Sequence, residues 1–163
     1  MSDAPFEVVE KTVASILVAG IRMKGRYSEC SKGYAAIGKR FGRKISGHAL
    51  LLIYDREYRE LDADFEACMP IREGEGNEQI SVRELGGGAA VTLLHKGSYE
   101  ELGKSYEKLR EYVGEKNYEV EMPTREVYLK GPGMILKGNP KKYLTELQFL
   151  IHGPDVRGSD SGD

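Results

Sequence analysis

The strongest constraint on the fold is a stretch that occurs twice along the chain. Residues 23–41 align with residues 95–113 without a gap when one copy is shifted by 72 positions. Two copies predict a pseudo-twofold domain, since solenoids need at least about three repeats. A functional site is then expected on the axis between the copies. The identical residues are Lys24 and Lys96, Gly25 and Gly97, Tyr27 and Tyr99, Glu29 and Glu101, Lys32 and Lys104, and Tyr34 and Tyr106.

Hydrophobic periodicity predicts the same element order in both halves: strand, helix, strand, strand, with a further strand at the start. Each helix is predicted by an apolar stripe with helical spacing. The stripes are Cys30, Tyr34, Ile37 and Phe41 in the first helix, and Leu102, Tyr106, Leu109 and Val113 in the second. Alternating or short apolar runs predict the strands. The clearest runs are 13–24, 49–55, 60–71, 80–85, 89–96, 126–130 and 143–151.

Length and composition restrict the classes of function. The 163 residues predict a single domain over 1–152, with halves at about 6–74 and 78–152, and a polar, glycine-rich tail over 153–163 that is expected to be disordered. A net charge of -2 without a basic run argues against direct nucleic-acid binding. No apolar stretch reaches the roughly 20 residues of a membrane span. Residues 1–6 lack the features of a signal peptide, so a cytoplasmic protein is expected.

Cysteine and histidine spacing predicts neither a disulfide nor a metal centre. Cys30 and Cys68 are far apart and read as buried thiols in a reducing compartment. The histidines His48, His95 and His152 are scattered without ligand spacing. No cofactor motif is present, because the glycines of 86–88 lack the context of a phosphate-binding loop. His95 has the core parity of its strand and is interpreted as a structural histidine.

The repeat continues into the later strands and pairs two carboxylates. Glu66 falls on Glu146 at a shift of 80, and Tyr54 falls on Tyr128 at a shift of 74. By strand parity, each glutamate lies on the less apolar face of an otherwise hydrophobic strand. Two related carboxylates are therefore expected to approach the pseudo-twofold axis.

Three motifs, in order, resemble the GyrI-like small-molecule-binding domain, the effector-binding domain of AraC-type and MerR-type multidrug regulators. They are H-K-G-S-Y-E-E-L at 95–102, D-A-D-F-E-A-C-M-P-I at 62–71, and R-E-V-Y-L-K-G-P-G with N-P-K-K-Y-L-T-E-L-Q-F-L-I at the end. The resemblance covers about residues 6–152. It implies an α+β fold in which two βαββ-type repeats form an antiparallel sheet with two main helices and a central ligand cleft. Leu150 replaces the usual proline, and the chain has no tryptophan.

The resemblance also implies a ligand site that takes bulky, aromatic and often cationic compounds. The glutamate it carries over is Glu146. A carboxylate in an apolar cleft is costly unless it is paired, and a cationic ligand could supply the pair. The alternative is that Glu146 is solvated or pairs with Arg22 or Lys96.

The other candidates also have two interpretations. Glu66 either contacts ligand or belongs to a solvated acidic face with Asp62 and Asp64. Tyr54 and Tyr128 either stack on ligand or belong to the core and its rim. Tyr34 and Tyr106 lie on the helix stripes and are read as core.

Three functions are compatible with these residues. The first is a stand-alone cytosolic binder of bulky hydrophobic, sometimes cationic, small molecules that senses or sequesters them, because no segment could form a helix-turn-helix. The second, also implied by the resemblance, is a hydrolase of strained cyclopropane compounds, with Glu146 acting on water and Tyr54 or Tyr128 as hydroxyl donor. The third is a protein-interaction module of the gyrase-inhibitor type. The binder is the leading prediction, and a protein partner stays open.

Overall fold

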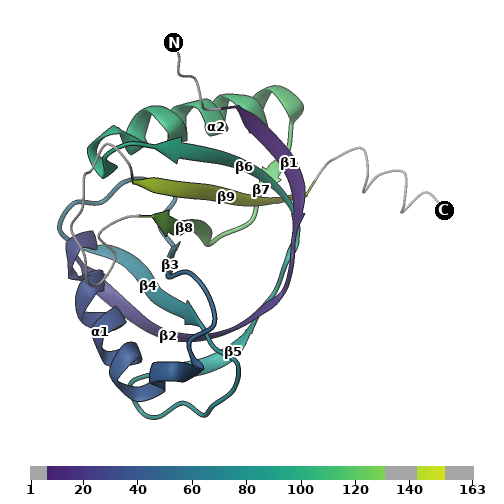
Figure 1. The fold of residues 1–163 in the computed structure, drawn as a ribbon. Helices are drawn as coiled ribbons and strands as arrows, with labels where there is room; N and C mark the ends of the chain where they lie inside the picture. The colour runs from purple at the N-terminus through teal and green to yellow at the C-terminus, as the bar shows by residue number, and fades with distance from the viewer. Residues whose placement is uncertain (1–6, 131–142, 153–163) are drawn as a thin grey trace.

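A curled antiparallel sheet with two helices packed on one face makes up the described part of the chain, residues 7–130 and 143–152 of the computed structural model (Figure 1). This arrangement confirms the predicted α+β class. The helices are α1 (Cys30–Phe41) and α2 (Leu102–Lys116), and short 3-10 turns are η1 (Tyr27–Glu29), η2 (Gly42–Lys44) and η3 (Tyr99–Glu101). The strands are β1 (Val8–Val13), β2 (Ile16–Gly25), β3 (Leu50–Ile53), β4 (Ala63–Pro70), β5 (Ser81–Leu85), β6 (Gly88–Lys96), β7 (Glu119–Val120), β8 (Thr124–Lys130) and β9 (Leu144–His152).

The strand order shows why the sheet must curl. The order is β1-β6-β9-β8-β3-β4-β2-β5, with β7 added on β9. Only residues 14–15 connect β1 at one end of this order to β2 near the other end, and residues 86–87 connect β5 to β6 in the same way. Links this short require the two ends of the sheet to lie close together, so the sheet forms a half-barrel (Figure 1). Each half of the chain thus pairs its first strand with the other half: β1 with β6, and β5 with β2.

The two helices cover the outer face of the curl, each over its own half. The stripe of α1 packs on β2 and β4, and the stripe of α2 packs on β6 and β9, as the periodicity predicted. The first core contains Ala19, Ile21, Tyr34, Ile37, Phe41, Ala67, Met69, Ile71 and Ile80. The second contains Val91, Leu93, Leu109, Val113, Leu147 and Phe149.

The other face of the sheet lies inside the curl. Side chains from three strands meet there: Val18 on β2, Leu52 on β3 and Leu85 on β5 share one apolar cluster. The guanidinium of Arg125 on β8 donates a hydrogen bond to the carbonyl of Gly86, between β5 and β6. This closure buries both faces of β4: Glu66, on the face inside the curl, is 3% exposed.

Some predictions differ from the structure or fall outside it. The two-residue strand β7 was not among the predicted strands, and α1 begins after η1 without a side-chain cap. Residues 134–137, to which the sequence pattern assigned no element, and the expected tail 153–163 lie outside the described residues. None of the helices in the described ranges is long and apolar enough to span a membrane.

Candidate functional site

The four predicted site residues lie on two different faces of the sheet. Glu66 and Tyr54 point inside the curl, and so does Glu146, whose register partner Val127 packs in the inner cluster. Tyr128 instead packs against the cores under the helices. The structure therefore brings Tyr54 and Glu66 together but does not bring Tyr128 to either predicted glutamate.

Glu66 is the buried member of an ion pair: its side chain is 4% exposed, and that of Arg83 is 37% exposed. Arg83 donates two hydrogen bonds to its carboxylate, at 2.7 and 2.8 Å, and the Tyr54 hydroxyl donates a third at 2.8 Å. Gly20 makes room for this carboxylate, since a Cβ on Gly20 would lie 2.3 Å from Oε2 of Glu66. Burial raises the pKa of Glu66, but the hydrogen bonds from Arg83 and Tyr54 outweigh it and leave the pKa below its ordinary value. The negative charge of Glu66 is thus already paired with a cation within the protein.

Glu146 occupies the equivalent position in the second half. In the strand register, Arg22 lies opposite Glu66 and Leu94 lies opposite Glu146, which matches the shifts of 72 and 80 found in the sequence. Lys11 Nζ lies 2.6 Å from Oε2 of Glu146, and Gln148 donates to the other oxygen at 2.8 Å. The Glu146 side chain is 16% exposed and Lys11 is 44% exposed. Each glutamate pairs with a cation on the first strand of the other half, so the two carboxylates have different partners.

The sequence alignment of Tyr54 with Tyr128 is wrong by one residue. Leu51 pairs with Ala67 and Glu126 pairs with Leu147, and residues 67 and 147 correspond at a shift of 80. Leu51 therefore corresponds to Glu126, at a shift of 75 rather than 74. A slip of one residue exchanges the two faces of a strand, which is why Tyr54 and Tyr128 lie on opposite faces.

Glu126 is the carboxylate that the sequence reading did not select. It lies on β8 at the centre of the sheet, directly opposite Leu51, and faces the outer side between the two helices. The hydroxyls of Tyr106 on α2 and Tyr128 both donate to it, the latter at 2.7 Å. Glu126 is 7% exposed. No lysine or arginine within 7–130 or 143–152 forms an ion pair with it. Its signal in the sequence was its parity: Glu126 shares a strand face with Tyr128.

An aromatic and sulfur-containing shell surrounds the Glu126 carboxylate. Tyr99 lies 5.8 Å from Tyr128 and 5.0 Å from Tyr143, ring centroid to ring centroid. On the side of the first half, Tyr27 lies 5.5 Å from Phe65. The shell contains Tyr27, Cys30, Tyr34, Tyr99, Tyr106 and Tyr128, and the negative charge of Glu126 helps to raise the pKa of each. For every member, burial is the larger cause.

The electrostatics of this cluster favour a positive partner. Burial raises the pKa of Glu126 above its ordinary value, although the hydrogen bonds from Tyr106 and Tyr128 and the charge of His95 act against this. An added cation would stabilise the ionised carboxylate and could also contact tyrosine faces. The same groups could exchange protons with a bound molecule, because a buried glutamate with a raised pKa is a stronger base than a solvated one.

Cysteine, histidine and acidic side chains form no group of three that could hold a metal ion within the described ranges. The two cysteines do not form a disulfide with each other: Cys68 is buried inside the curl, and Cys30 belongs to the shell around Glu126. The candidate site therefore consists of one carboxylate and its aromatic surroundings.

Comparisons with known proteins place this geometry in context. A family model described as GyrI-like small molecule binding domain matches residues 6–152. The structure is similar to EcmrR in the cryo-EM structure of an EcmrR-DNA complex, with 25% identity and a TM-score of 0.82 over 91% of this chain and 58% of that one, so this chain spans less than two thirds of that protein. It is also similar to the crystal structure of the EcmrR C-terminal domain, with 23% identity and a TM-score of 0.76 over 91% of this chain and 98% of that one.

A third similar structure contains a ligand. It is SAV2435 bound to tetraphenylphosphonium, with 14% identity and a TM-score of 0.54 over 94% of this chain and 98% of that one. At this identity the likeness concerns the fold alone. No curated protein sequence matches the chain.

Proposed function

This chain belongs to the family of GyrI-like small molecule binding domains, and on that premise we propose that it binds bulky hydrophobic cations at the Glu126 cluster. In this proposal the protein senses or sequesters such compounds in the cytosol. Glu126 supplies the countercharge, and Tyr27, Tyr99 and Tyr128 supply the apolar contact.

The observation that carries the proposal is the pairing of Glu126. Among the described residues its hydrogen-bond partners are two tyrosine hydroxyls and no lysine or arginine pairs with it, although the residue is almost fully buried. Glu66 and Glu146 are bonded to Arg83 and Lys11. A buried charge without an opposite charge costs several kcal/mol, so a positive ligand would relieve a cost that the fold otherwise carries.

The aromatic shell fits the same ligand class. A cation over a tyrosine face gains about 0.5–2 kcal/mol. The bound ligand of SAV2435, tetraphenylphosphonium, has this chemistry, since its single positive charge is enclosed by four phenyl rings. It is therefore a suitable first probe for this chain.

The proposal is tested by titrating tetraphenylphosphonium into wild type, Glu126→Gln and Glu146→Gln. Glutamine removes the charge and keeps the shape of the side chain: its amide oxygen can accept from one tyrosine hydroxyl, and its NH2 group can donate to the other. We expect Glu126→Gln to weaken binding about tenfold, or 1.4 kcal/mol, and Glu146→Gln to change it less than about twofold. Loss of binding in Glu146→Gln alone would move the site inside the curl, and equal binding by all three proteins would refute a carboxylate-centred site.

Hydrolysis is a second candidate, favoured by the two tyrosine hydroxyls beside one carboxylate. Glu126 would take a proton from water as the water oxygen attacks a strained ring carbon. The broken carbon–carbon bond would leave its electron pair on a conjugated carbonyl, which Tyr106 or Tyr128 would protonate. Mass spectrometry of an activated cyclopropane compound checks this: a ring-opened product one water heavier, formed by wild type but not by Glu126→Gln, would establish it. Ring opening at the buffer rate would exclude it.

A further inference from the structure

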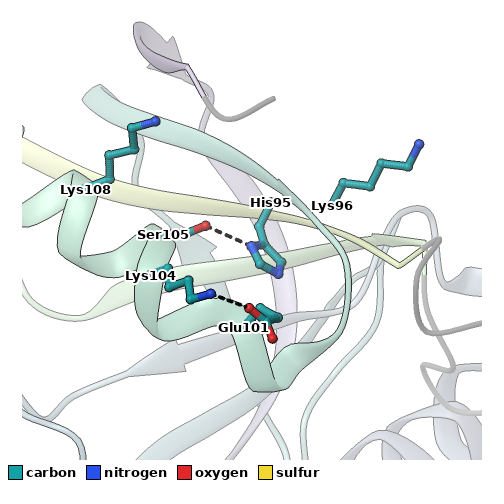
Figure 2. Close-up of a pocket in the computed structure, with 6 residues that line it drawn as sticks. All are labelled: His95, Lys96, Glu101, Lys104, Ser105 and Lys108. Atoms are coloured by element: carbon teal, nitrogen blue, oxygen red, sulfur yellow. Dashed lines mark hydrogen bonds and ion pairs between the residues drawn. The ribbon is translucent and has the colours of Figure 1, made fainter. Parts of the chain in front are cut away.

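A cavity of about 320 Å³ lies beside α2, next to the C-terminal end of β6 (Figure 2). Its lining carries three cationic side chains and one anionic one. Glu101 pairs with Lys104 at 3.1 Å, so the charge around the cavity is on balance positive. The lining residues are His95, Lys96, Glu101, Lys104, Ser105 and Lys108.

The floor of this cavity is a buried polar pair. His95 and Ser105 are 3% and 4% exposed, and His95 Nδ1 lies 2.8 Å from Ser105 Oγ. His95 Nε2 lies 3.0 Å from the carbonyl oxygen of Ser98. Because a carbonyl can only accept, Nε2 must carry a hydrogen, and in the neutral ring Nδ1 accepts from the Ser105 hydroxyl.

The first half of the chain shows what this position contains when it serves packing alone. At the shift of 72, His95 corresponds to Met23 and Ser105 corresponds to Gly33. A Cβ on Gly33 would lie 3.2 Å from the Met23 sulfur and 2.9 Å from Cβ of Ala67, so this position is filled by apolar contact. The same scaffold thus has an apolar contact in one half and a histidine–serine pair below three lysines in the other.

We propose that the cavity binds the dianionic phosphate group of a small molecule, with Lys96, Lys104 and Lys108 around it and Ser105 at its base. Lysine ammonium groups bind phosphate as point charges. This site differs from the Glu126 cluster in position and in the sign of its ligand. It therefore does not depend on the proposed cation binding.

Thermal unfolding with inorganic phosphate, at constant ionic strength set with chloride, tests the site. A ligand that binds only the folded state raises the midpoint, by an amount that grows with the logarithm of its concentration above the Kd. We expect phosphate to stabilise wild type in this way, with an affinity that falls about fivefold or more in Lys104→Met. The matched control is Lys32→Met. Lys32 corresponds to Lys104 and likewise pairs with a glutamate three residues before it, Glu29, at 3.5 Å.

Three results would overturn the proposal: no stabilisation of wild type by phosphate, an equal loss in Lys32→Met, or no loss in Lys104→Met.

The source of the phosphate is separated in a second arm. Soluble phosphomonoesters are compared with phosphatidylcholine vesicles that contain phosphatidic acid. Lys104-dependent binding of the soluble compounds assigns a metabolite, and Lys104-dependent co-sedimentation with the vesicles alone assigns a lipid headgroup.

Discussion

The two halves of this chain share one scaffold and differ in chemistry at equivalent positions. Inside the curl, equivalent ion pairs link the two halves: Glu66 with Arg83, and Glu146 with Lys11. On the outer face the halves diverge: Leu51 corresponds to Glu126, and the apolar pair Met23–Gly33 corresponds to His95–Ser105. The symmetric features build the sheet, and both proposed sites lie where the second half departs from the first.

The two ion pairs should differ most in their contribution to stability. Arg83→Met leaves the carboxylate of Glu66 buried without a cation, whereas Lys11→Met leaves Glu146 partly in water. We expect losses of about 2–4 kcal/mol for Arg83→Met and under about 1 kcal/mol for Lys11→Met. Urea unfolding measures both. Similar losses would show that burial does not distinguish the two halves.

The acid limb of stability should report the same pair. Glu66 has a lowered pKa in the folded state, so its contribution is present above the pKa of an unfolded glutamate and is lost as the pH falls through the folded value. Arg83→Met should therefore flatten the stability profile below about pH 5.

Alanine should destabilise the protein more at position 33 on α1 than at the equivalent position 105 on α2. Gly33→Ala adds a Cβ 2.9 Å from that of Ala67, which is fixed to the backbone, and is expected to cost about 1–3 kcal/mol. Ser105→Ala at the equivalent position exchanges one hydrogen bond for better helix propensity and should change stability by less than about 1 kcal/mol. Thermal unfolding of both variants decides this, and a neutral Gly33→Ala would refute the close packing.

Removing the charge of Glu126 should stabilise the fold while weakening the proposed cation binding. Folded Glu126 holds its proton more tightly than the unfolded chain does, so wild-type stability is full at low pH and falls as the pH rises through the raised pKa. Glu126→Gln cannot ionise and should be more stable than wild type by about 1 kcal/mol at pH 8, with the difference vanishing near pH 4. Urea titrations at both pH values check the sign. Lower stability of the variant at pH 8 would contradict an uncompensated charge.

The smallest difference concerns the exposed pairs at the start of each helix. Glu29–Lys32 and Glu101–Lys104 are equivalent, and removing either lysine should change stability by less than about 0.5 kcal/mol. A larger loss in Lys104→Met without added phosphate would indicate that Lys104 supports the fold, and its use as a binding variant would then need a charge-preserving arginine control.

The parts of the fold that depend on local periodicity could be predicted from the sequence. The apolar stripes of α1 and α2 lie where the spacing placed them, and the shift of 80 correctly related Glu66 to Glu146. The partners of these glutamates could not be predicted, because Arg83 and Lys11 arrive through the exchange of first strands between halves. Burial on both faces of β4 depends on the same exchange.

The prediction of the candidate site failed because the alignment of the two repeats was wrong by one residue. Aligning Tyr54 with Tyr128 also aligned Glu126 with Leu52, on the wrong face of the sheet, so the central position of Glu126 was missed. Strand sequences with two tyrosines and few other landmarks align equally well at neighbouring shifts. Only the hydrogen-bonded register, Leu51 with Glu126, separates the alternatives.

The exchange of first strands also bears on how such a chain can be assembled. Neither half contains a complete sheet, because β1 completes the second half and β5 completes the first. The two halves are joined at residues 72–80 by a connection that contributes no strand. Two halves produced as separate chains could form the complete sheet only by exchanging their first strands. In physical terms, the fold is therefore a strand-swapped dimer of two repeats that are joined by a covalent connection.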